Sequence, residues 1–317
     1  MTSRSKPADL RRTARWWFFI IGLFLLAGCS PAEQVSPPVV TPARLPPATA
    51  TVPRATLTAT PTPAPTLTPA PTENPRQCWQ EGGQIVTAAL PAETLPYPLP
   101  VRVYLPPCYD QLPAMRYPVL YLIHGQNFSE DQWERLGAPA VADRLIAAQQ
   151  APPFIIVMPG ERSWEQPADT GWDEAFLNVL MPWVESHFRT LEDRRYRAIG
   201  GLSRGASWAI HLGLSRPDLF GSIGGHSPPV FWEDVSRVRT WLAAIPEGEW
   251  PRIYLDIGDA DQQQILASAR WFEDLLTQGN YPHEWHLNVG RHNEAYWQAH
   301  TEAYLRWYTA HWWLAPP

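Results

Sequence analysis

Lysine is almost absent from this sequence. Lys6 is the only lysine among 317 residues, charged residues make up 18% of the chain, and 31 acidic side chains outnumber 25 basic ones, giving a formal net charge of -6. A nucleic-acid partner requires clustered Lys and Arg that neutralise phosphates. We therefore expect no nucleic-acid partner.

The apolar run near the start of the chain is short. It extends from Trp16 to Ala27, about a dozen residues where a membrane-spanning helix needs roughly 20. It follows a basic segment, which is typical of a signal peptide. The run ends in Leu26-Ala27-Gly28-Cys29, which resembles the bacterial lipobox, so we expect Cys29 to be lipidated and to become the mature N-terminus. The alternative is an uncleaved anchor helix.

Cysteine is scarce, with three residues in the chain. If Cys29 carries the lipid, Cys78 and Cys108 remain as a pair in an exported, oxidising compartment. We expect a disulfide between them, the alternative being two unpaired buried thiols. The predicted location is extracytoplasmic, in a bacterial cell envelope and lipid-anchored to the membrane.

Proline is abundant, with 36 residues, many of them between positions 31 and 75. This region is rich in Pro, Thr and Ala and has no hydrophobic periodicity, so it cannot bury enough surface to fold. The sequence therefore predicts three parts: a lipoprotein signal peptide at 1–28, a disordered Pro/Thr-rich linker or stalk at 29–76, and a folded domain at 77–317.

Short β-branched runs alternate with helix-length segments in the folded part, which predicts an α/β domain with a mostly parallel sheet and helices on both faces. The first two runs are joined by a Pro-rich connection without a helix, so we expect an antiparallel N-terminal edge. The predicted strands are 101–105, 119–123, 154–158, 196–199, 222–225, 253–257 and 285–289. The predicted helices include 138–149, 176–188, 204–215 and 264–279.

A G-x-S-x-G motif lies between a predicted strand and a predicted helix. It reads Gly201-Leu202-Ser203-Arg204-Gly205. Glycines flank the serine because a nucleophile elbow turns too sharply for side chains at those positions. The motif predicts Ser203 as a nucleophile.

A nucleophilic serine needs a base, and the base needs an orienting carboxylate. Asp259 and Asp261 follow the predicted strand 253–257, and His292 follows the predicted strand 285–289. Ligands gather at the carboxyl ends of parallel strands, so these side chains are expected near Ser203. His283 and His286 lack a third ligand in register, and we expect no metal site.

Several segments together resemble the putative-esterase family of α/β-hydrolases, which includes esterase D, feruloyl esterases, enterochelin esterases and mycolyltransferases. The resemblance covers essentially the whole folded part. The segments are Val101-Arg102-Val103-Tyr104-Leu105-Pro106, Tyr117-Pro118-Val119-Leu120-Tyr121-Leu122-Ile123-His124-Gly125, Gly201-Leu202-Ser203-Arg204-Gly205 and Arg216-Pro217-Asp218-Leu219-Phe220.

The resemblance implies an α/β-hydrolase fold, with Ser203 as nucleophile and His292 as general base. The family's Gly-x-x-Asp spacing selects Asp261 as the acid and leaves Asp259 as a loop-capping residue.

It also implies an oxyanion hole made by the backbone N–H of Arg204 and that of Gln126, or alternatively Asn127. His124 is interpreted as structural. The sequence departs from the family in having Ala206 where a second glycine is frequent and Cys108 where glycine is common.

Tryptophans are numerous. Trp133, Trp164 and Trp172 follow predicted strands, where they line either a substrate pocket or the core, whereas Trp208, Trp271 and Trp307 are expected in the core. The function predicted is an exported, lipid-anchored serine carboxylic ester hydrolase that acts through an acyl-enzyme. We expect a small-molecule or glycan-linked ester as substrate and no cofactor. The alternatives are an envelope acyltransferase with the same triad and a non-catalytic binding module.

Overall fold

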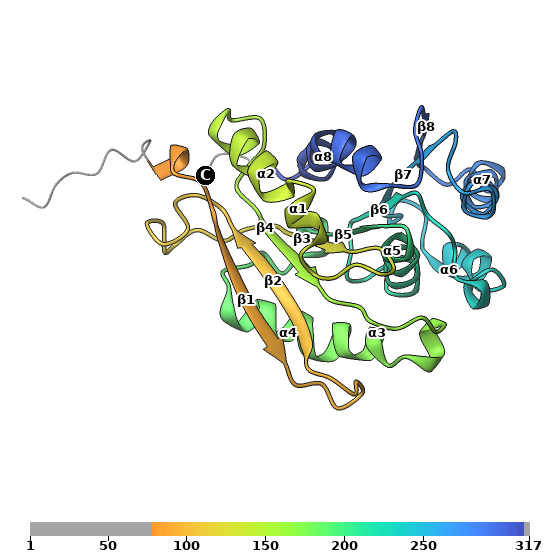
Figure 1. Cartoon of the computed structure of the whole chain (residues 1–317), viewed down its shortest axis with the longest axis horizontal. Coiled ribbons are helices and arrows are strands. Elements are labelled where there is room, and N and C mark those ends of the chain that lie inside the picture. Colours follow the sequence, from red (N-terminus) through yellow and green to blue (C-terminus); the bar gives the residue numbers. More distant parts are fainter. Residues whose placement is uncertain (1–77, 314–317) are drawn as a thin grey trace, which may run out of the picture. The chain divides into compact units, whose positions relative to one another are not determined.

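The computed structural model describes residues 78–313, and Figure 1 presents their helices and strands. Cys29, the predicted signal peptide and the whole of the predicted Pro/Thr-rich linker at 29–76 lie outside this range. Within it, no helix is both long enough and apolar enough to cross a membrane.

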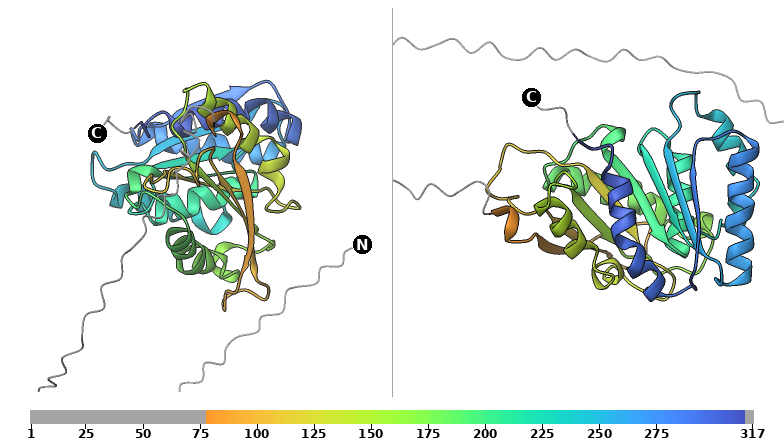
Figure 2. Two further views of the ribbon diagram at one scale, coloured as in Figure 1. Left: turned by 90° about the vertical axis from the view of Figure 1, so that its left-hand side faces the viewer. Right: turned by 90° about the horizontal axis from the view of Figure 1, so that it is seen from above.

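An eight-stranded sheet forms the centre of the described part, in the order β1-β2-β4-β3-β5-β6-β7-β8. β1 pairs antiparallel with β2, β2 pairs antiparallel with β4, and the other neighbours are parallel. β1 lies at the outer edge, drawn in orange in Figure 2. The strands are β1 Gln84–Leu90, β2 Leu99–Leu105, β3 Val119–Ile123, β4 Ile155–Pro159, β5 Arg197–Leu202, β6 Ser222–His226, β7 Arg252–Gly258 and β8 Glu284–Asn288.

Helices cover both faces of this sheet, and each face packs against its helices through a separate apolar core. In Figure 1, α2 and α8 lie above the sheet, and α3 to α6 lie below it. The α-helices are α1 Gln132–Arg135, α2 Ala138–Ala147, α3 Trp172–Ala175, α4 Met181–His187, α5 Arg204–Ser215, α6 Val238–Ala244, α7 Gln263–Gln278 and α8 Glu294–Thr309. Short turns are η1 Cys78–Gln80, η2 Pro167–Asp169, η4 Arg194–Tyr196, η5 Trp232–Asp234 and the π-helical η3 Phe176–Leu180.

The predicted α/β class, the mostly parallel sheet and the antiparallel N-terminal edge are confirmed. β1 was not among the elements that the sequence predicted. In addition, the helix expected at 176–188 begins earlier, because α3, η3 and α4 follow one another without a break from Trp172.

The predicted disulfide joins Cys78 in η1 to Cys108 in the loop after β2, with the two Cα atoms 5.1 Å apart. Cys108 has a φ of 61°, a conformation that glycine adopts more readily than any other residue. This is the position at which the family resemblance leads one to expect glycine.

Tyr308 of α8 enters a notch in the sheet made by two facing glycines. Gly200 of β5 and Gly224 of β6 pair in register. A Cβ atom placed on either would lie 1.8 Å or 1.7 Å from the Tyr308 hydroxyl oxygen. The absence of side chains there lets α8 approach closely to β5 and β6, which end at the site.

Candidate active site

Ser203 lies at a sharp turn between β5 and α5, with φ 53° and ψ -124°. The two motif glycines are required by close packing. A Cβ on Gly205 would lie 2.2 Å from the carbonyl oxygen of Ile123, and one on Gly201 would lie 2.3 Å from the backbone of Gly205. The strained backbone of Ser203 projects its hydroxyl beyond the strand end, which is the geometry of a nucleophile elbow.

The structure brings Ser203, His292 and Asp261 together, although they come from three different loops. His292 Nε2 lies 2.9 Å from Ser203 Oγ, and His292 Nδ1 lies 2.8 Å from Asp261 Oδ1. The second contact has the distance of an ion pair, but the carboxylate lies off the direction of a straight hydrogen bond from Nδ1. The Asp261 carboxylate is fully buried. This arrangement can transfer the serine proton to the imidazole and stabilise the resulting charge.

Asp259 takes a different position in the same loop. It is exposed, and its carboxylate accepts a hydrogen bond of 3.1 Å from the backbone N–H of Gly290. The contact joins the loops that follow β7 and β8. The structure therefore directs Asp261 at His292 and leaves Asp259 in a loop-joining position.

Ser227 supports Asp261 from the end of β6, and sequence reasoning missed it. Its hydroxyl donates a hydrogen bond of 2.9 Å to Asp261 Oδ2 and accepts one of 3.2 Å from the indole N–H of Trp297. The backbone N–H of Gln262 donates to Asp261 Oδ1 at 2.6 Å. Ser227 has a φ of 52°, uncommon for a residue other than glycine. No sequence motif marks this contact, because it joins residues 34 positions apart.

A buried polar cluster holds the end of β6 in place. Asp256 lies 2.7 Å from His226 Nδ1 and accepts hydrogen bonds from the hydroxyls of Tyr296 and Tyr304. Burial, and then the charge of Asp256, raise the pKa of both tyrosines, so their hydroxyls stay protonated and donate. The His226 carbonyl in turn accepts the N–H of Ser203 at 2.8 Å. The sequence offered one signal for this cluster, since His226 directly follows the predicted strand 222–225.

The two residues predicted to form the oxyanion hole, Arg204 and Gln126, both lie beside Ser203. Arg204 is the first residue of α5, where a helix has no intrahelical acceptor for its N–H. Gln126 lines the same cavity as Ser203. Its neighbour Gly125 is fixed by a hydrogen bond of 2.8 Å from the Gly125 N–H to Gln132 Oε1. Asn127, the alternative, has a φ of 68°.

Arg204 also fixes the loop after β4. Its guanidinium forms a buried ion pair with Glu161 at 2.7 Å. The backbone N–H of Glu161 donates to His124 Nε2 at 2.7 Å. Burial lowers the pKa of His124, which keeps the ring neutral and able to accept this bond. These contacts support a structural role for His124.

A cavity of about 710 Å3 opens beside Ser203. Two of the predicted pocket tryptophans are corrected: Trp133 and Trp172 are buried in the core, where their indole N–H groups donate to the carbonyls of Ile123 and Gly160. Trp164 is exposed and does not line this cavity. The residues that line it are Gly125, Gln126, Asn127, Phe128, Ser203, Gln262, Ile265, His292, Asn293, Glu294, Ala295 and Trp297.

Metal-ligating side chains do not gather in groups of three anywhere within residues 78–313. His283 lies near Glu273, and His286 lies near Glu284, each at 3.7 Å. The first contact joins the loop before β8 to α7, and the second lies within β8.

Comparison with known proteins identifies relatives among esterases. The chain is 28% identical over 244 residues to an esterase of Mycobacterium tuberculosis, covering 61% of this chain and 52% of the relative. It is 33% identical over 139 residues to an endo-1,4-beta-xylanase/feruloyl esterase of Xylanibacter ruminicola, covering 39% of this chain and 18% of the relative. The chain thus spans about half, or less, of the length of these curated relatives.

A solved structure of a ferulic acid esterase superimposes with a TM-score of 0.65 at 25% identity, covering 73% of this chain and 99% of the other. A family model described as "Putative esterase" matches residues 92–308. That match includes strands β2 to β8, the elbow and the three clustered side chains, and we conclude that this chain belongs to the putative-esterase family of α/β-hydrolases.

Proposed function

We propose that this protein is a serine carboxylic ester hydrolase that acts through an acyl-enzyme. The observation that carries the proposal is the clustering of Ser203, Asp261 and His292, which follow the carboxyl ends of β5, β7 and β8, with contacts of 2.9 Å and 2.8 Å. Membership of an esterase family and the similarity to named esterases support it.

In the acylation step, Ser203 Oγ attacks the ester carbonyl carbon while His292 Nε2 takes the hydroxyl proton. The C–O bond to the alcohol then breaks, and the imidazolium returns its proton to the departing alcohol oxygen. In deacylation, His292 removes a proton from water, which attacks the acyl-enzyme. The acid leaves and Ser203 regains its proton.

The remaining residues stabilise charge along this path. The backbone N–H groups of Arg204 and Gln126 would hold the oxyanion of each tetrahedral intermediate. Asp261 would stabilise the imidazolium of His292, and its buried position strengthens that interaction because water is excluded.

Aromatic acyl esters are the substrate class that we propose, with the acyl group in the cavity beside Ser203. The names of the similar proteins include ferulic acid and feruloyl esterases. The cavity supplies apolar walls from Phe128, Ile265 and Trp297 together with a few polar groups, the usual composition of a small-molecule site. An acyltransferase would use the same acyl-enzyme, and adding an acceptor alcohol distinguishes the two, since only a transferase gives mainly the new ester.

The test is a panel of p-nitrophenyl, feruloyl and acetyl-sugar esters together with a fluorophosphonate probe. We expect the probe to label Ser203 in the wild type, and Ser203→Ala to lose both labelling and nearly all hydrolysis. Ser186→Ala, at an exposed serine of α4, is the control and should keep both. Full activity in Ser203→Ala would end the hydrolase proposal.

We also propose that the mature protein is anchored by lipid at Cys29 and lies outside the cytoplasm in a bacterial envelope. The basic segment, the short apolar run and the Leu26-Ala27-Gly28-Cys29 motif support this. The disulfide between Cys78 and Cys108 is also consistent with an oxidising compartment.

A further inference from the structure

Two tryptophans outside the cavity are unusually exposed. The exposed fraction is 65% for Trp164 and 82% for Trp232, whereas Trp133, Trp172 and Trp208 are almost completely buried. Exposed indole rings are costly in water and, where they gather, often mark a binding surface.

The loops that carry these two tryptophans touch each other. Trp164 follows β4, and Trp232 follows β6 at the start of η5. The backbone N–H of Glu233 donates to the side chain of Gln166 at 3.3 Å, and the backbone N–H of Ala168 donates to the side chain of Glu233 at 3.0 Å. The two loops therefore form one continuous surface at the carboxyl end of the sheet.

Arg204 anchors both loops next to the nucleophile. Its guanidinium donates to the carbonyl of Glu165 at 2.7 Å, one residue after Trp164. The same guanidinium lies over the ring of Phe231, with its carbon 5.1 Å from the ring centre, one residue before Trp232. Because Arg204 directly follows Ser203, the positions of both loops are tied to the nucleophile elbow.

We propose that Trp164 and Trp232 form a sugar-binding surface that holds the alcohol part of a glycan-linked ester while Ser203 attacks its carbonyl. This inference rests on the proposed esterase function and specifies its substrate class. Sugar rings have apolar C–H faces that pack on indole rings, and their hydroxyls stay in water, which suits rings as exposed as these.

The exposure of the two rings favours the sugar over the acyl group as occupant. An aromatic acyl group is mostly apolar and gains by enclosure, and the cavity beside Ser203, which neither tryptophan lines, provides that enclosure. An extended, hydrated chain of sugars instead fits an open surface. The cavity would then bind the acyl part of the ester, and the tryptophan surface would bind its sugar part.

The experiment compares two esters with the same acyl group, methyl ferulate and a feruloylated xylo-oligosaccharide. In Trp164→Ala and Trp232→Ala we expect kcat/KM for the oligosaccharide ester to fall about five- to tenfold through KM, and more in the double variant. The values for methyl ferulate should stay within about twofold of the wild type.

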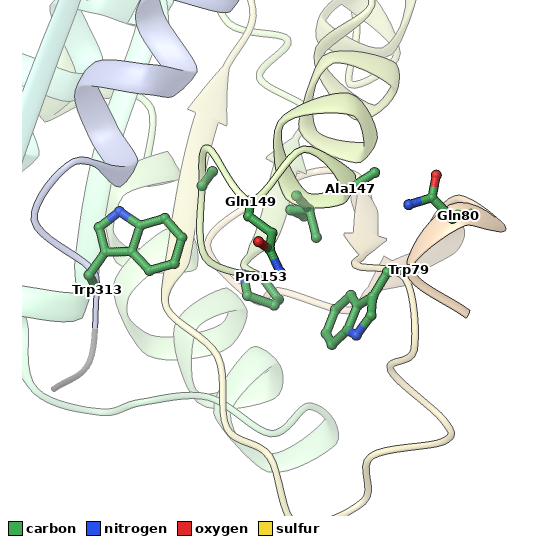
Figure 3. Close-up of a pocket in the computed structure, with 8 residues that line it drawn as sticks. Trp79, Gln80, Ala147, Gln149, Pro153 and Trp313 are labelled. Atoms are coloured by element: carbon green, nitrogen blue, oxygen red, sulfur yellow. The ribbon is translucent and has the colours of Figure 1, made fainter. Parts of the chain in front are cut away.

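Trp313→Ala is the matched control. Trp313 is 53% exposed and, in Figure 3, faces a separate pocket together with Trp79, with Gln149 and Pro153 between them. Its neighbour Trp312 bonds to the carbonyl of Arg195, just before β5 begins, so Trp313 belongs to the opposite end of the sheet from Ser203. Its variant should behave as the wild type with both esters.

Three results would overturn the inference. The tryptophan variants could lower kcat/KM equally for both esters, which would assign the tryptophans to the acyl group or to folding. The tryptophan variants could leave both rates unchanged. The Trp313 variant could produce the oligosaccharide-specific loss instead. If the wild type hydrolyses no ester, the proposed function fails, but calorimetric titration with unesterified xylo-oligosaccharide still tests the sugar site. Binding by the wild type that is lost in the double variant supports the site. Absence of binding by the wild type refutes it.

Discussion

At the scale of single residues, the loop after β7 offers two carboxylates with different surroundings. We expect Asp261→Asn to lower kcat/KM on the order of a thousandfold or more, because an amide cannot stabilise the imidazolium. Asp259→Asn should keep most of the rate, since an Asn side-chain oxygen can still accept the N–H of Gly290. Steady-state kinetics on one ester measures both. The reverse order would move the acid to Asp259.

Ser227 gives a second prediction, as a positioning residue that acts through Asp261. Ser227→Ala would leave the Trp297 N–H and an oxygen of Asp261 without this partner in a buried site, which costs about 1 to 3 kcal/mol. We expect kcat to fall about ten- to hundredfold with KM nearly unchanged. Ser207→Ala removes an equally buried hydroxyl that bonds to the Pro229 carbonyl instead. Equal losses of kcat in the two variants would show a general packing effect.

His124 makes stability depend on pH. Burial lowers its pKa in the folded state, while an unfolded histidine titrates near about 6.5. The contribution of His124 to the free energy of unfolding is therefore complete above about pH 6.5 and is lost as pH falls toward the folded pKa. The free energy of unfolding then changes by at most about 1.4 kcal/mol per pH unit. Urea unfolding between about pH 5 and 8 should show a flatter profile for His124→Gln than for wild type. The exposed His187→Gln should keep the wild-type slope.

Residue order allowed the Ser203, Asp261 and His292 cluster to be anticipated, because each side chain follows a run that reads as a strand. Their catalytic roles stay predictions. The same approach left Trp133 and Trp172 open between a substrate pocket and the core, because a position after a strand does not show that the ring turns inward to donate to a backbone carbonyl.

At the scale of elements, the disulfide ties η1 to the end of β2. Replacing both cysteines by serine should lower the free energy of unfolding by about 3 to 4 kcal/mol, from the entropy of a loop with a sequence separation of 30. Because β2 runs antiparallel to β4, the bridge lies at the end of the sheet away from Ser203, so kcat should not change. Urea unfolding of the double variant and of the wild type, oxidised and reduced, tests this. Equal free energies of unfolding for the wild type before and after reduction would contradict the prediction.

The parallel strands β3 to β7 were predictable because burial on both faces favours continuous apolar runs. β1 was not, since all of its residues except Leu90 are partly or fully exposed at the sheet edge. The bounds of α8 were not predicted. Its buried face includes Tyr and Trp side chains, two of which bond to the distant Asp256, and the polar residues between them weaken the apolar periodicity.

At the scale of the whole molecule, the N-terminal sequence predicts that the protein is attached to a membrane. We expect Cys29→Ala to shift the protein from the membrane to the soluble fraction and to abolish metabolic labelling with palmitate, since stable anchoring needs two lipid signals. The variant without Cys78 and Cys108 is the control and should stay with the membrane. A Cys29→Ala protein that still sediments with membranes would favour the uncleaved anchor helix.

The notch that receives Tyr308 restricts the order in which substitutions at Gly200, Gly224 and Tyr308 can accumulate. Alanine at Gly200 or Gly224 collides with the tyrosine, and phenylalanine at 308 gives no relief, because the ring carbon Cζ lies 2.7 Å or 2.5 Å from the same Cβ positions. A smaller residue at 308 must therefore come first, at the cost of a cavity. A lineage descending from this chain could fill the notch only by passing through a less stable intermediate, so the two glycines and the tyrosine are expected to be inherited together.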